Sequence, residues 1–431
     1  MVGIKWGMKL NKREALLKDV KTREAEWLTL LQNLIRFETP APPARNTSSI
    51  QNFVAEELQA SGCTIDRWPL YPGDEVVVGT KMGYENEKAP KLILNGHVDV
   101  AQVDESEPWQ HEPFSPLIED GYVYGRGAAD MKGGLAGILF SLRLLNDYGI
   151  SFPGDIYVQS VTGEEVGEAG TKSCTTRGYD ADFALVADTS NLEIQGQGGV
   201  VTGWVTVKSR KTFHDAERQR MIHAGGGIYG ASAIEKMMKV INSLQELERH
   251  WAVTKSYPGF PYGSTTINPA VIEGGRHAAF VADECHLWIT VHYYPDEHHD
   301  EVIQEIESHL QKAAAADPWL RHHPLEFQWG GTSMIEDRGE VFPPLAVDES
   351  NPGVKLLKQA HEQVHKEAPT VSMSPTVTDG GWFSDAGIPA VIYGPGDLAN
   401  AHAVDERVSV EQLRTYIQTL VCFLLDWGEI D

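Results

Sequence analysis

The chain has 431 residues, and its 61 Asp and Glu residues exceed its 36 Lys and Arg residues by 25. Because nucleic-acid binding draws much of its affinity from cationic side chains, we expect neither nucleic acid nor an anionic membrane surface as a partner. The 42% hydrophobic and 23% charged residues are typical of a globular protein, and the length predicts two domains.

No run of the sequence reaches the roughly 18 apolar residues that would span a bilayer, and the first twenty residues carry charges throughout. The cysteines lie far apart and form no CxxC pair, so neither a disulfide framework nor a thiolate zinc site is expected. These features predict a soluble cytoplasmic protein.

The outer parts of the chain predict an α/β fold. Helical patterns cover residues 12–36 and about 49–61, and a proline-rich loop separates them. Short apolar strands alternating with helices predict a sheet that is covered on both faces. The predicted strands are 75–80, 91–100, 155–165, 182–190 and 388–396, with a further helix over 131–147.

The pattern changes at about residue 198. Alternating strands at 200–209 and 284–295, each followed by an amphipathic helix, and a last strand at 324–331 predict a ferredoxin-like α+β unit. Strand–helix alternation resumes after about residue 331. We therefore expect a domain of residues 199–330 inserted into a discontinuous domain of residues 1–198 and 331–431.

Side chains of metal-ligand type follow the predicted strands. His97 and Asp99 end the strand 91–100, and residues two apart on a strand point the same way. The Asp99 carboxylate is therefore expected to approach and orient the His97 ring, as carboxylates do for metal-bound histidines. Taken alone, this short motif also fits an ordinary strand-end turn.

Two further motifs carry carboxylates. Asp130, in GRGAADMKGG, fits a helix N-cap, and it also fits a carboxylate that gives one oxygen to each of two cations. In GEEVGEAG, Glu164 and Glu165 are adjacent and point in different directions, so one can bind metal while the other faces a reacting water. The alternative is a solvated acidic turn.

Asp188 and His402 complete the set. Each follows an apolar run, 183–187 and 389–393 respectively. Because ligand sites of open α/β sheets gather at the carboxyl ends of strands, we expect these side chains to converge with the others.

The order of the five motifs resembles the M20 metallopeptidase and amidohydrolase family, which includes acetylornithine deacetylase, succinyl-diaminopimelate desuccinylase, aminoacylase and carboxypeptidases. The resemblance spans nearly the whole chain. It implies a zinc-exopeptidase-like catalytic domain with a central, mostly parallel sheet, and a lid and dimerisation domain over residues 199–330. The motifs are GHVDV (96–100), GRGAADMKGG (125–134), GEEVGEAGT (163–171), VADTS (186–190) and GPGDLANAHAVDE (394–406).

The resemblance also implies two divalent metal ions, zinc first, with cobalt or manganese as alternatives. The implied ligands are His97 and Asp188 for one ion, Glu165 and His402 for the other, and Asp130 as the bridge. Glu164 is then the general base and Asp99 the orienting partner of His97. His223 matches the lid histidine that stabilises the oxyanion in the other subunit's active site.

Two segments depart from the family pattern. The lid strand reads TVHYYP where the family usually has an arginine, which puts His292 at that position. The lid is also enlarged at 211–220 and 250–266. The candidate contacts for a substrate carboxylate are Asn268, Arg276, His292 and the backbone amides of Gly394 and Gly396.

The expected reaction is removal of a small acyl group from an N-acyl amino acid or a related N-acyl amine, by a homodimer that resembles acetylornithine deacetylase. A dipeptidase, aminopeptidase or carboxypeptidase with the same machinery is the main alternative. A catalytically silent binding protein is a remote one.

Two other motifs are weighed and set aside. His361, Glu362 and His365 fit the HExxH signature of zincins, but an apolar stripe on the same predicted helix favours core packing. The glycines of residues 225–230 fit GxGxxG, but no predicted strand precedes them, so a dinucleotide site is not expected.

Overall fold

The computed structural model describes residues 2–85, 89–104, 106–168 and 170–428. The chain forms two compact units: unit 1 is Met1–Gln197 with Leu345–Asp431, and unit 2 is Gly198–Pro344. The sequence placed the second boundary at residue 330. Unit 2 extends further because β17 (Val341–Phe342) pairs with β11 (Gly199–Lys208).

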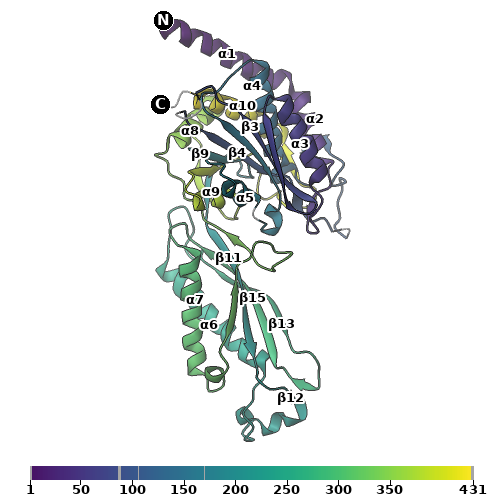
Figure 1. Cartoon of the computed structure of the whole chain (residues 1–431), viewed down its shortest axis with the longest axis vertical. Helices are drawn as coiled ribbons and strands as arrows, with labels where there is room; N and C mark the ends of the chain where they lie inside the picture. Colours follow the sequence, from purple (N-terminus) through teal and green to yellow (C-terminus); the bar gives the residue numbers. More distant parts are fainter. Residues whose placement is uncertain (1, 86–88, 105, 169, 429–431) are drawn as a thin grey trace. The chain divides into compact units, whose positions relative to one another are not determined.

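Unit 1 is built on an eight-stranded mixed sheet (Figure 1). The neighbouring strands β19, β9, β4 and β8 are parallel, whereas β3 and β2 continue the sheet in antiparallel pairing. In spatial order the strands are β18 (Val371–Ser374), β10 (Ile194–Gln197), β19 (Ala390–Ile392), β9 (Phe183–Val186), β4 (Leu92–His97), β8 (Ile156–Val161), β3 (Asp74–Lys81) and β2 (Thr64–Tyr71).

Helices cover both faces of this sheet. Because successive strand residues point to opposite faces, Leu92 and Leu94 join the large core under α2, α3, α4, α8 and α10, while Ile93 joins a smaller core under α9. The helices of unit 1 are α1 (Val2–Thr22), α2 (Glu24–Ile35), α3 (Ser48–Ala60), α4 (Gly133–Asp147), α5 (Gly170–Thr176), α8 (Pro352–His365), α9 (Gly380–Asp385) and α10 (Val410–Trp427).

Small elements complete unit 1. They form a two-stranded and a three-stranded sheet beside the main one. Their strands are β1 (Pro40–Ala41) with β5 (Val100–Ala101), and β20 (Arg407–Ser409) with β7 (Tyr122–Tyr124) and β6 (Leu117–Glu119).

The helix predicted over residues 12–36 is two helices that meet at Arg23. The indole N–H of Trp27, from the second helix, donates to the Val20 carbonyl of the first at 2.9 Å. This buried bond ties the two helices together at their junction.

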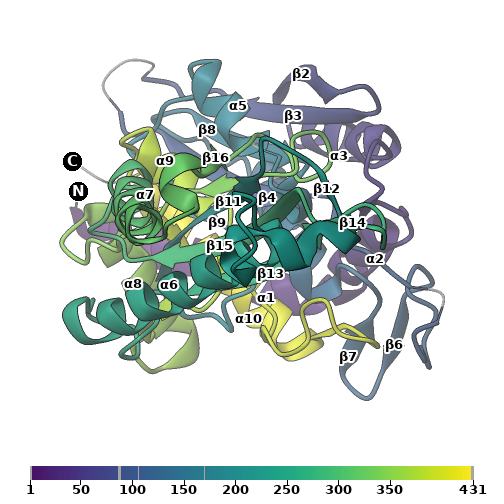
Figure 2. The same cartoon turned by 90° about the horizontal axis from the view of Figure 1, so that it is seen from below.

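Unit 2 has the order β11, α6, β13, β15, α7, β16, which is the predicted ferredoxin-like order with one strand, β13, added. Its antiparallel sheet has the spatial order β13-β15-β11-β16, and α6 and α7 lie side by side on one face (Figures 1 and 2). The edge strand β13 was not anticipated. The new elements are α6 (Ala233–Thr254), β13 (Ile267–Gly274), β15 (Glu284–Tyr293), α7 (His299–Ala316) and β16 (Glu326–Trp329), and β12 (Phe213–His214) pairs with β14 (Phe280–Val281) apart from the main sheet.

The two faces of the unit 2 sheet differ in composition. Val205, Leu287 and Ile289 belong to the core shared with α6 and α7. Trp204 pairs across the strands with Trp288, and these residues alternate with the core residues. Aromatic side chains therefore lie on the face that the two helices do not cover.

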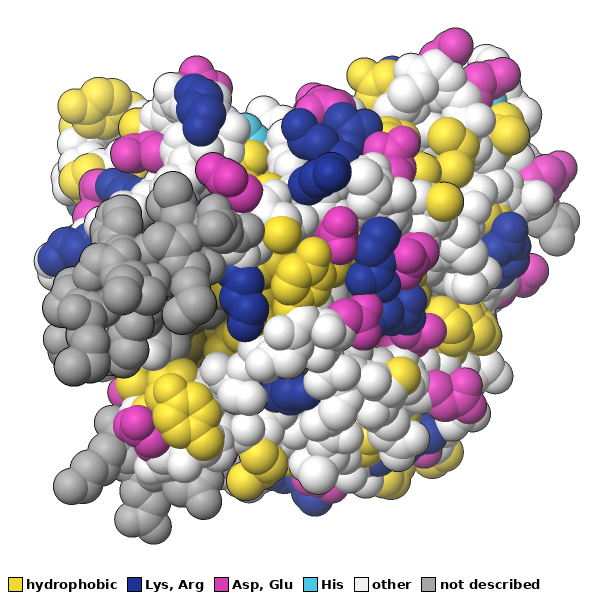
Figure 3. All heavy atoms as spheres, turned by 90° about the horizontal axis from the view of Figure 1, so that it is seen from above, with side chains coloured by type: hydrophobic (Ala, Val, Ile, Leu, Met, Phe, Trp, Pro, Cys, Tyr) yellow, Lys and Arg dark blue, Asp and Glu magenta, His cyan; other side chains and the backbone are white. Residues whose placement is uncertain are grey.

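Charged side chains of both signs lie on the surface of the described residues (Figure 3). No helix among the described residues is long and apolar enough to cross a membrane. On the face shown in Figure 3, acidic and basic side chains of the described residues are interspersed.

Candidate metal centre

Predicted site residues follow neighbouring parallel strands at one edge of the unit 1 sheet. β4 ends at His97, Glu164 and Glu165 follow β8, Asp188 follows β9, and the loop after β19 carries His402. Because the carboxyl ends of parallel strands share one edge, the fold brings these side chains together.

Asp130 lies between the two histidines. Its Oδ1 is 3.2 Å from His97 Nε2, and its Oδ2 is 3.3 Å from His402 Nε2. It stands in an irregular turn (Ala128–Lys132) before α4, with φ −120° and ψ 96°, outside the helical region. Its side chain makes no N-cap bond to α4, and its two oxygens face different partners, as a bridging carboxylate requires.

The donor atoms form two groups that share Asp130. His97 Nε2 is 4.0 Å from Asp188 Oδ2, and His402 Nε2 is 3.0 Å from Glu165 Oε2. Tetrahedral zinc with bonds of about 2.0–2.2 Å places its ligand atoms roughly 3.3–3.5 Å apart. The spacing of these nitrogen and oxygen atoms therefore fits two divalent ions.

Lysine and arginine side chains of the described residues do not balance the negative charge of this cluster. Within the described ranges, no Lys or Arg forms an ion pair with the carboxylates of the cluster. Glu165 Oε1 is buried without a hydrogen-bond partner among the described residues. Buried carboxylates need a counter-charge, and divalent ions would supply it.

The pKa values of the cluster residues reflect the lack of a lysine or arginine counter-charge in the part of the chain that the structure describes. Burial, reinforced by the charge of Asp130, raises the pKa of Asp188 to about 8. Burial also raises the pKa of Glu165 to about 7, and hydrogen bonds to Asp130 and Glu165 raise the pKa of His402 to about 11. Because metal ligands must be deprotonated, binding of divalent ions by these donors would release protons.

Glu164 faces the same space. Its Oε2 is 3.9 Å from His97 Nε2, and its side chain is 12% exposed. Burial raises the pKa of Glu164 well above its usual value, and the nearby Asp188 and Glu165 charges act in the same direction. A carboxylate with a raised pKa can take a proton from water near neutral pH and pass it on.

Asp99 orients His97 through a different atom from the one predicted. His97 Nδ1 donates to the Asp99 backbone carbonyl at 2.9 Å, whereas the carboxylate Oδ1 is 3.8 Å away. The carboxylate Oδ2 accepts the Glu165 N–H at 3.0 Å instead. Asp99 therefore directs Nε2 of His97 into the site and also holds the turn that carries Glu165.

An ion-pair network that the sequence did not reveal joins Arg45 to Glu168 and Asp74. Arg45 donates to the two oxygens of Glu168 at 2.7 and 2.8 Å and to Asp74 at 3.0 Å. Both carboxylates are fully buried. One indication of this network was present in the sequence, because Glu168 is a charged residue inside a glycine-rich motif. Its partner Arg45 lies 123 residues away, so the pairing could not be predicted from local spacing.

The backbone amides proposed for a substrate carboxylate are already engaged. The Gly394 N–H donates to the Ser190 hydroxyl at 3.0 Å, and the Gly396 N–H donates to the Gln412 side chain at 2.8 Å. These internal bonds remove both amides from the set of free donors.

The remaining predicted residues belong to unit 2. His223 is exposed in a short turn (Ile222–Ala224), and Asn268 lies on the exposed strand β13. His292 on β15 is half-buried, and burial lowers its pKa. Arg276 pairs with Asp283 at 2.9 Å, so its charge already has a partner.

The HExxH run is part of the core and not a metal site. The rings of His361 and His365 stack 4.0 Å apart, and His361 Nδ1 is 2.8 Å from the Tyr393 hydroxyl. Glu362 is exposed to solvent. No third ligand joins the two histidines among the described residues, so the zincin alternative is wrong.

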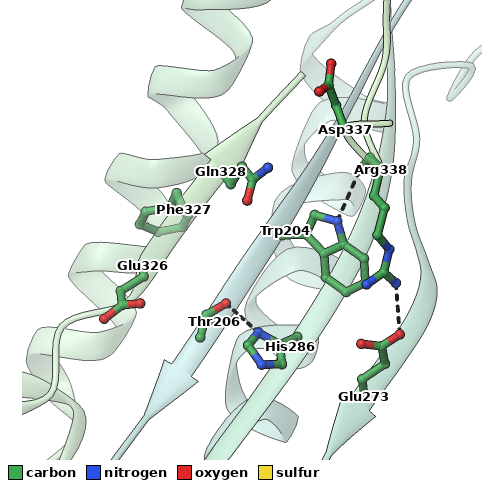
Figure 4. Close-up of a pocket in the computed structure, with 9 residues that line it drawn as sticks. All are labelled: Trp204, Thr206, Glu273, His286, Glu326, Phe327, Gln328, Asp337 and Arg338. Carbon is green, nitrogen blue, oxygen red and sulfur yellow. Dashed lines mark hydrogen bonds and ion pairs between the residues drawn. The ribbon is translucent and has the colours of Figure 1, made fainter. Parts of the chain in front are cut away.

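Unit 2 contains a separate pocket of about 360 Å³ on the sheet face opposite its helices (Figure 4). Arg338 lies over the Trp204 ring at 4.4 Å and pairs with Glu273 at 2.9 Å. None of the predicted site residues lines this pocket. It is therefore distinct from the cluster at the strand ends of unit 1.

Known proteins resemble the chain along most of its length. The model of peptidase family M20/M25/M40 matches residues 93–426. The chain is 57% identical over 413 residues to a protein of Bacillus subtilis (strain 168) named N-formyl-4-amino-5-aminomethyl-2-methylpyrimidine deformylase, covering 96% of this chain and 97% of that protein. A protein of the same name from Halalkalibacterium halodurans is 56% identical, with 97% and 98% coverage.

A solved structure shares the fold. The M20 family metallo-carboxypeptidase Sso-CP2 from Sulfolobus solfataricus superposes with a TM-score of 0.73 at 19% identity. The superposition covers 94% of this chain and 100% of the other. At 19% sequence identity this similarity supports a shared architecture and gives no information about the substrate.

Proposed function

Because the chain belongs to peptidase family M20/M25/M40, we propose that its strand-end cluster removes the formyl group from an N-formylated aminomethylpyrimidine. The chain is a hydrolase of C–N amide bonds that removes a small acyl group from an N-acyl amine. The observation that carries the finer assignment is the identity of more than half of all residues to two deformylases, over nearly the whole of each chain.

The chemistry of this substrate agrees with the polar groups present. An N-formyl aminomethylpyrimidine has a formamide and a heteroaromatic ring but no carboxylate. It needs no cationic clamp, which suits a lid strand with His292 in place of the family arginine. Since burial lowers the pKa of His292, its ring is neutral near pH 7 and can hydrogen-bond an uncharged pyrimidine.

Family members are dinuclear metal enzymes, and we propose zinc in both positions, with cobalt or manganese able to replace it. The proposed ligands are His97, Asp188, Glu165 and His402, with Asp130 between the ions. When bound, two such ions supply the positive charge that polarises the formyl carbonyl and acidifies a water.

The proposed proton path runs through Glu164. Its carboxylate removes a proton from the attacking water and returns it to the amine nitrogen as the C–N bond breaks. His223 of the lid is proposed to donate to the developing oxyanion. Asp99 keeps His97 in the tautomer that presents Nε2 to the site.

We further propose a cytoplasmic homodimer formed through unit 2. The edge strand β13 is exposed along nearly its whole length and presents Val271 and Ile272. Unpaired edge strands of this kind readily pair with another chain. The four cysteines are all free and buried, which suits a reducing compartment.

The test is a substrate panel with zinc-loaded protein. We expect formate release from the N-formyl aminomethylpyrimidine at a kcat/KM at least about 100-fold above that for its N-acetyl analogue, N-acetylornithine or a dipeptide. Faster turnover of N-acetylornithine or of a dipeptide would contradict the deformylase assignment and favour the corresponding alternative.

A further inference from the structure

Arg126 and Glu406 form a buried ion pair although they are 280 residues apart. Arg126 Nη1 donates to Glu406 Oε2 at 2.8 Å, and the side chains are 1% and 0% exposed. A buried ion pair is weak evidence for stability in itself, because desolvation offsets much of the attraction. Its role depends on the other groups that each partner holds.

Glu406 holds the backbone at Asp130. Its Oε1 accepts the N–H groups of Ala129 at 2.9 Å and Asp130 at 3.0 Å. The backbone of Asp130 is outside the helical region, so regular helical hydrogen bonds do not position it. Glu406 supplies the acceptor that this irregular turn lacks.

Arg126 holds the loop that carries His402. Its Nη2 donates to the His402 carbonyl and its Nη1 donates to the Ala403 carbonyl, both at 3.3 Å. His402 has a positive φ of 58°, and its side chain is 55% exposed. The ring contacts Asp130 and Glu165, but neither regular secondary structure nor close packing holds the backbone that carries it. The two bonds from Arg126 help to fix that backbone.

We propose that Arg126 and Glu406 are positioning residues that set the separation between Asp130 and His402. They thereby strengthen binding of the ion on the His402 side. The inference rests on the metal ligands assigned in the proposed function. It gives roles to Arg126 and Glu406, which have none in that assignment.

The other ion depends less on this pair. His97 is the last residue of the buried strand β4, and Asp188 follows β9 after one residue. Regular strands position both. Loss of the pair is therefore expected to weaken one ion selectively.

The test is titration of metal-free protein with Co²⁺, whose visible absorption reports the surroundings of each bound ion. In Arg126→Met we expect the affinity for the Co²⁺ ion on the His402 side to fall by about 10–100-fold. The affinity for the Co²⁺ ion on the His97 side should change by less than about threefold. Arg126→Lys keeps a charge opposite Glu406 but lacks the planar fork that reaches both carbonyls. Its affinity for the ion on the His402 side should lie between those of Arg126→Met and wild type.

Lys236→Met is the matched control. It removes a buried cation that pairs with Asp317 at 2.9 Å in unit 2, which supplies none of the proposed metal ligands. This variant should lose thermal stability and keep both Co²⁺ affinities. A general effect of losing a buried ion pair is thereby separated from an effect on the metal centre.

Unchanged affinities in folded Arg126→Met, or equal weakening of both, would overturn the inference, as would a wild type that binds only one ion. If Arg126→Met does not fold, Glu406→Gln is judged by the same criteria, since it keeps an acceptor for the two amides and loses the charge. A wild type that binds two ions but releases no formate, with the selective loss still seen, contradicts the proposed function alone.

Discussion

Asp130 is the residue that both halves of the proposed metal centre share. Each of its carboxylate oxygens lies within 3.3 Å of a different histidine, and both proposed groups of donors include it. A single substitution at this position therefore removes one ligand from each proposed ion.

We expect Asp130→Ala to lower the metal content from two equivalents to one or none, because both ions lose a charged ligand. Elemental analysis after dialysis against a metal-free buffer measures this loss. A full two equivalents in the variant would rule out the bridging assignment.

Glu164 provides the complementary case. Glu164→Gln keeps the size of the side chain but cannot accept the proton from water, so we expect deformylation to fall by about 100-fold or more. Metal content should stay at two equivalents, since Glu164 is not a proposed ligand. A variant that retains most of its turnover would exclude Glu164 as the general base.

At the scale of elements, α8 and α10 illustrate how packing can override a motif. α8 presents His361 and His365 as a stacked pair, and Tyr393 and Thr419 lie beside them. Burial, with the neighbouring His365 in second place, lowers the pKa of His361 to about 4. The two histidines of the HExxH run therefore pack in the core between α8 and α10.

This histidine predicts a pH dependence of stability. Below its usual pKa of about 6.5 the unfolded chain takes up a proton that the folded chain accepts only near pH 4, so stability falls as the pH is lowered through that window. The contribution is at most about 3 kcal/mol. Urea unfolding of the wild type at pH 8 and pH 5 measures the total decrease.

His361→Asn isolates the contribution of this residue. The asparagine amide can still hydrogen-bond the Tyr393 hydroxyl but does not titrate. The decrease in unfolding free energy from pH 8 to pH 5 should be smaller in this variant, whereas loss of metal at low pH affects both proteins alike. An equal decrease in the two proteins would show that His361 is not responsible.

At the scale of the whole molecule, the proposed dimer depends on the exposed edge strand β13 of unit 2. We expect wild type to be a dimer and Ile272→Lys to be a monomer, because a lysine on an edge strand opposes pairing with a second copy. Light scattering after gel filtration measures both masses. Leu117→Lys, at a residue of unit 1 that is 43% exposed against 54% for Ile272, is the control that should remain dimeric.

The alternation of apolar strands and helices was sufficient to predict both units and their fold classes. It did not reveal β13, because this strand is exposed and lacks the alternating burial by which strands are recognised. The end of unit 2 was also predicted too early in the chain, because β17 is two residues long and can be recognised as a strand only by its pairing with β11.

The sequence by itself determined which chemistry the protein can perform. Histidine and carboxylate residues after successive apolar strands must converge, because parallel strands end at one edge of the sheet. The site residues that could therefore be named from their places after predicted strands are His97, Glu164, Glu165, Asp188 and His402. Asp130 was named from its place in a glycine-rich motif at the start of a predicted helix.

Only the tertiary structure decided which atoms meet. Asp99 orients His97 through its carbonyl, Arg45 pairs with Glu168, and Arg126 pairs with Glu406. The two ion pairs join segments more than a hundred residues apart, whose distance depends on how intervening loops pack and not on local spacing. Local patterns thus predict the type of a side chain and its edge of the sheet, whereas long-range packing selects its partner.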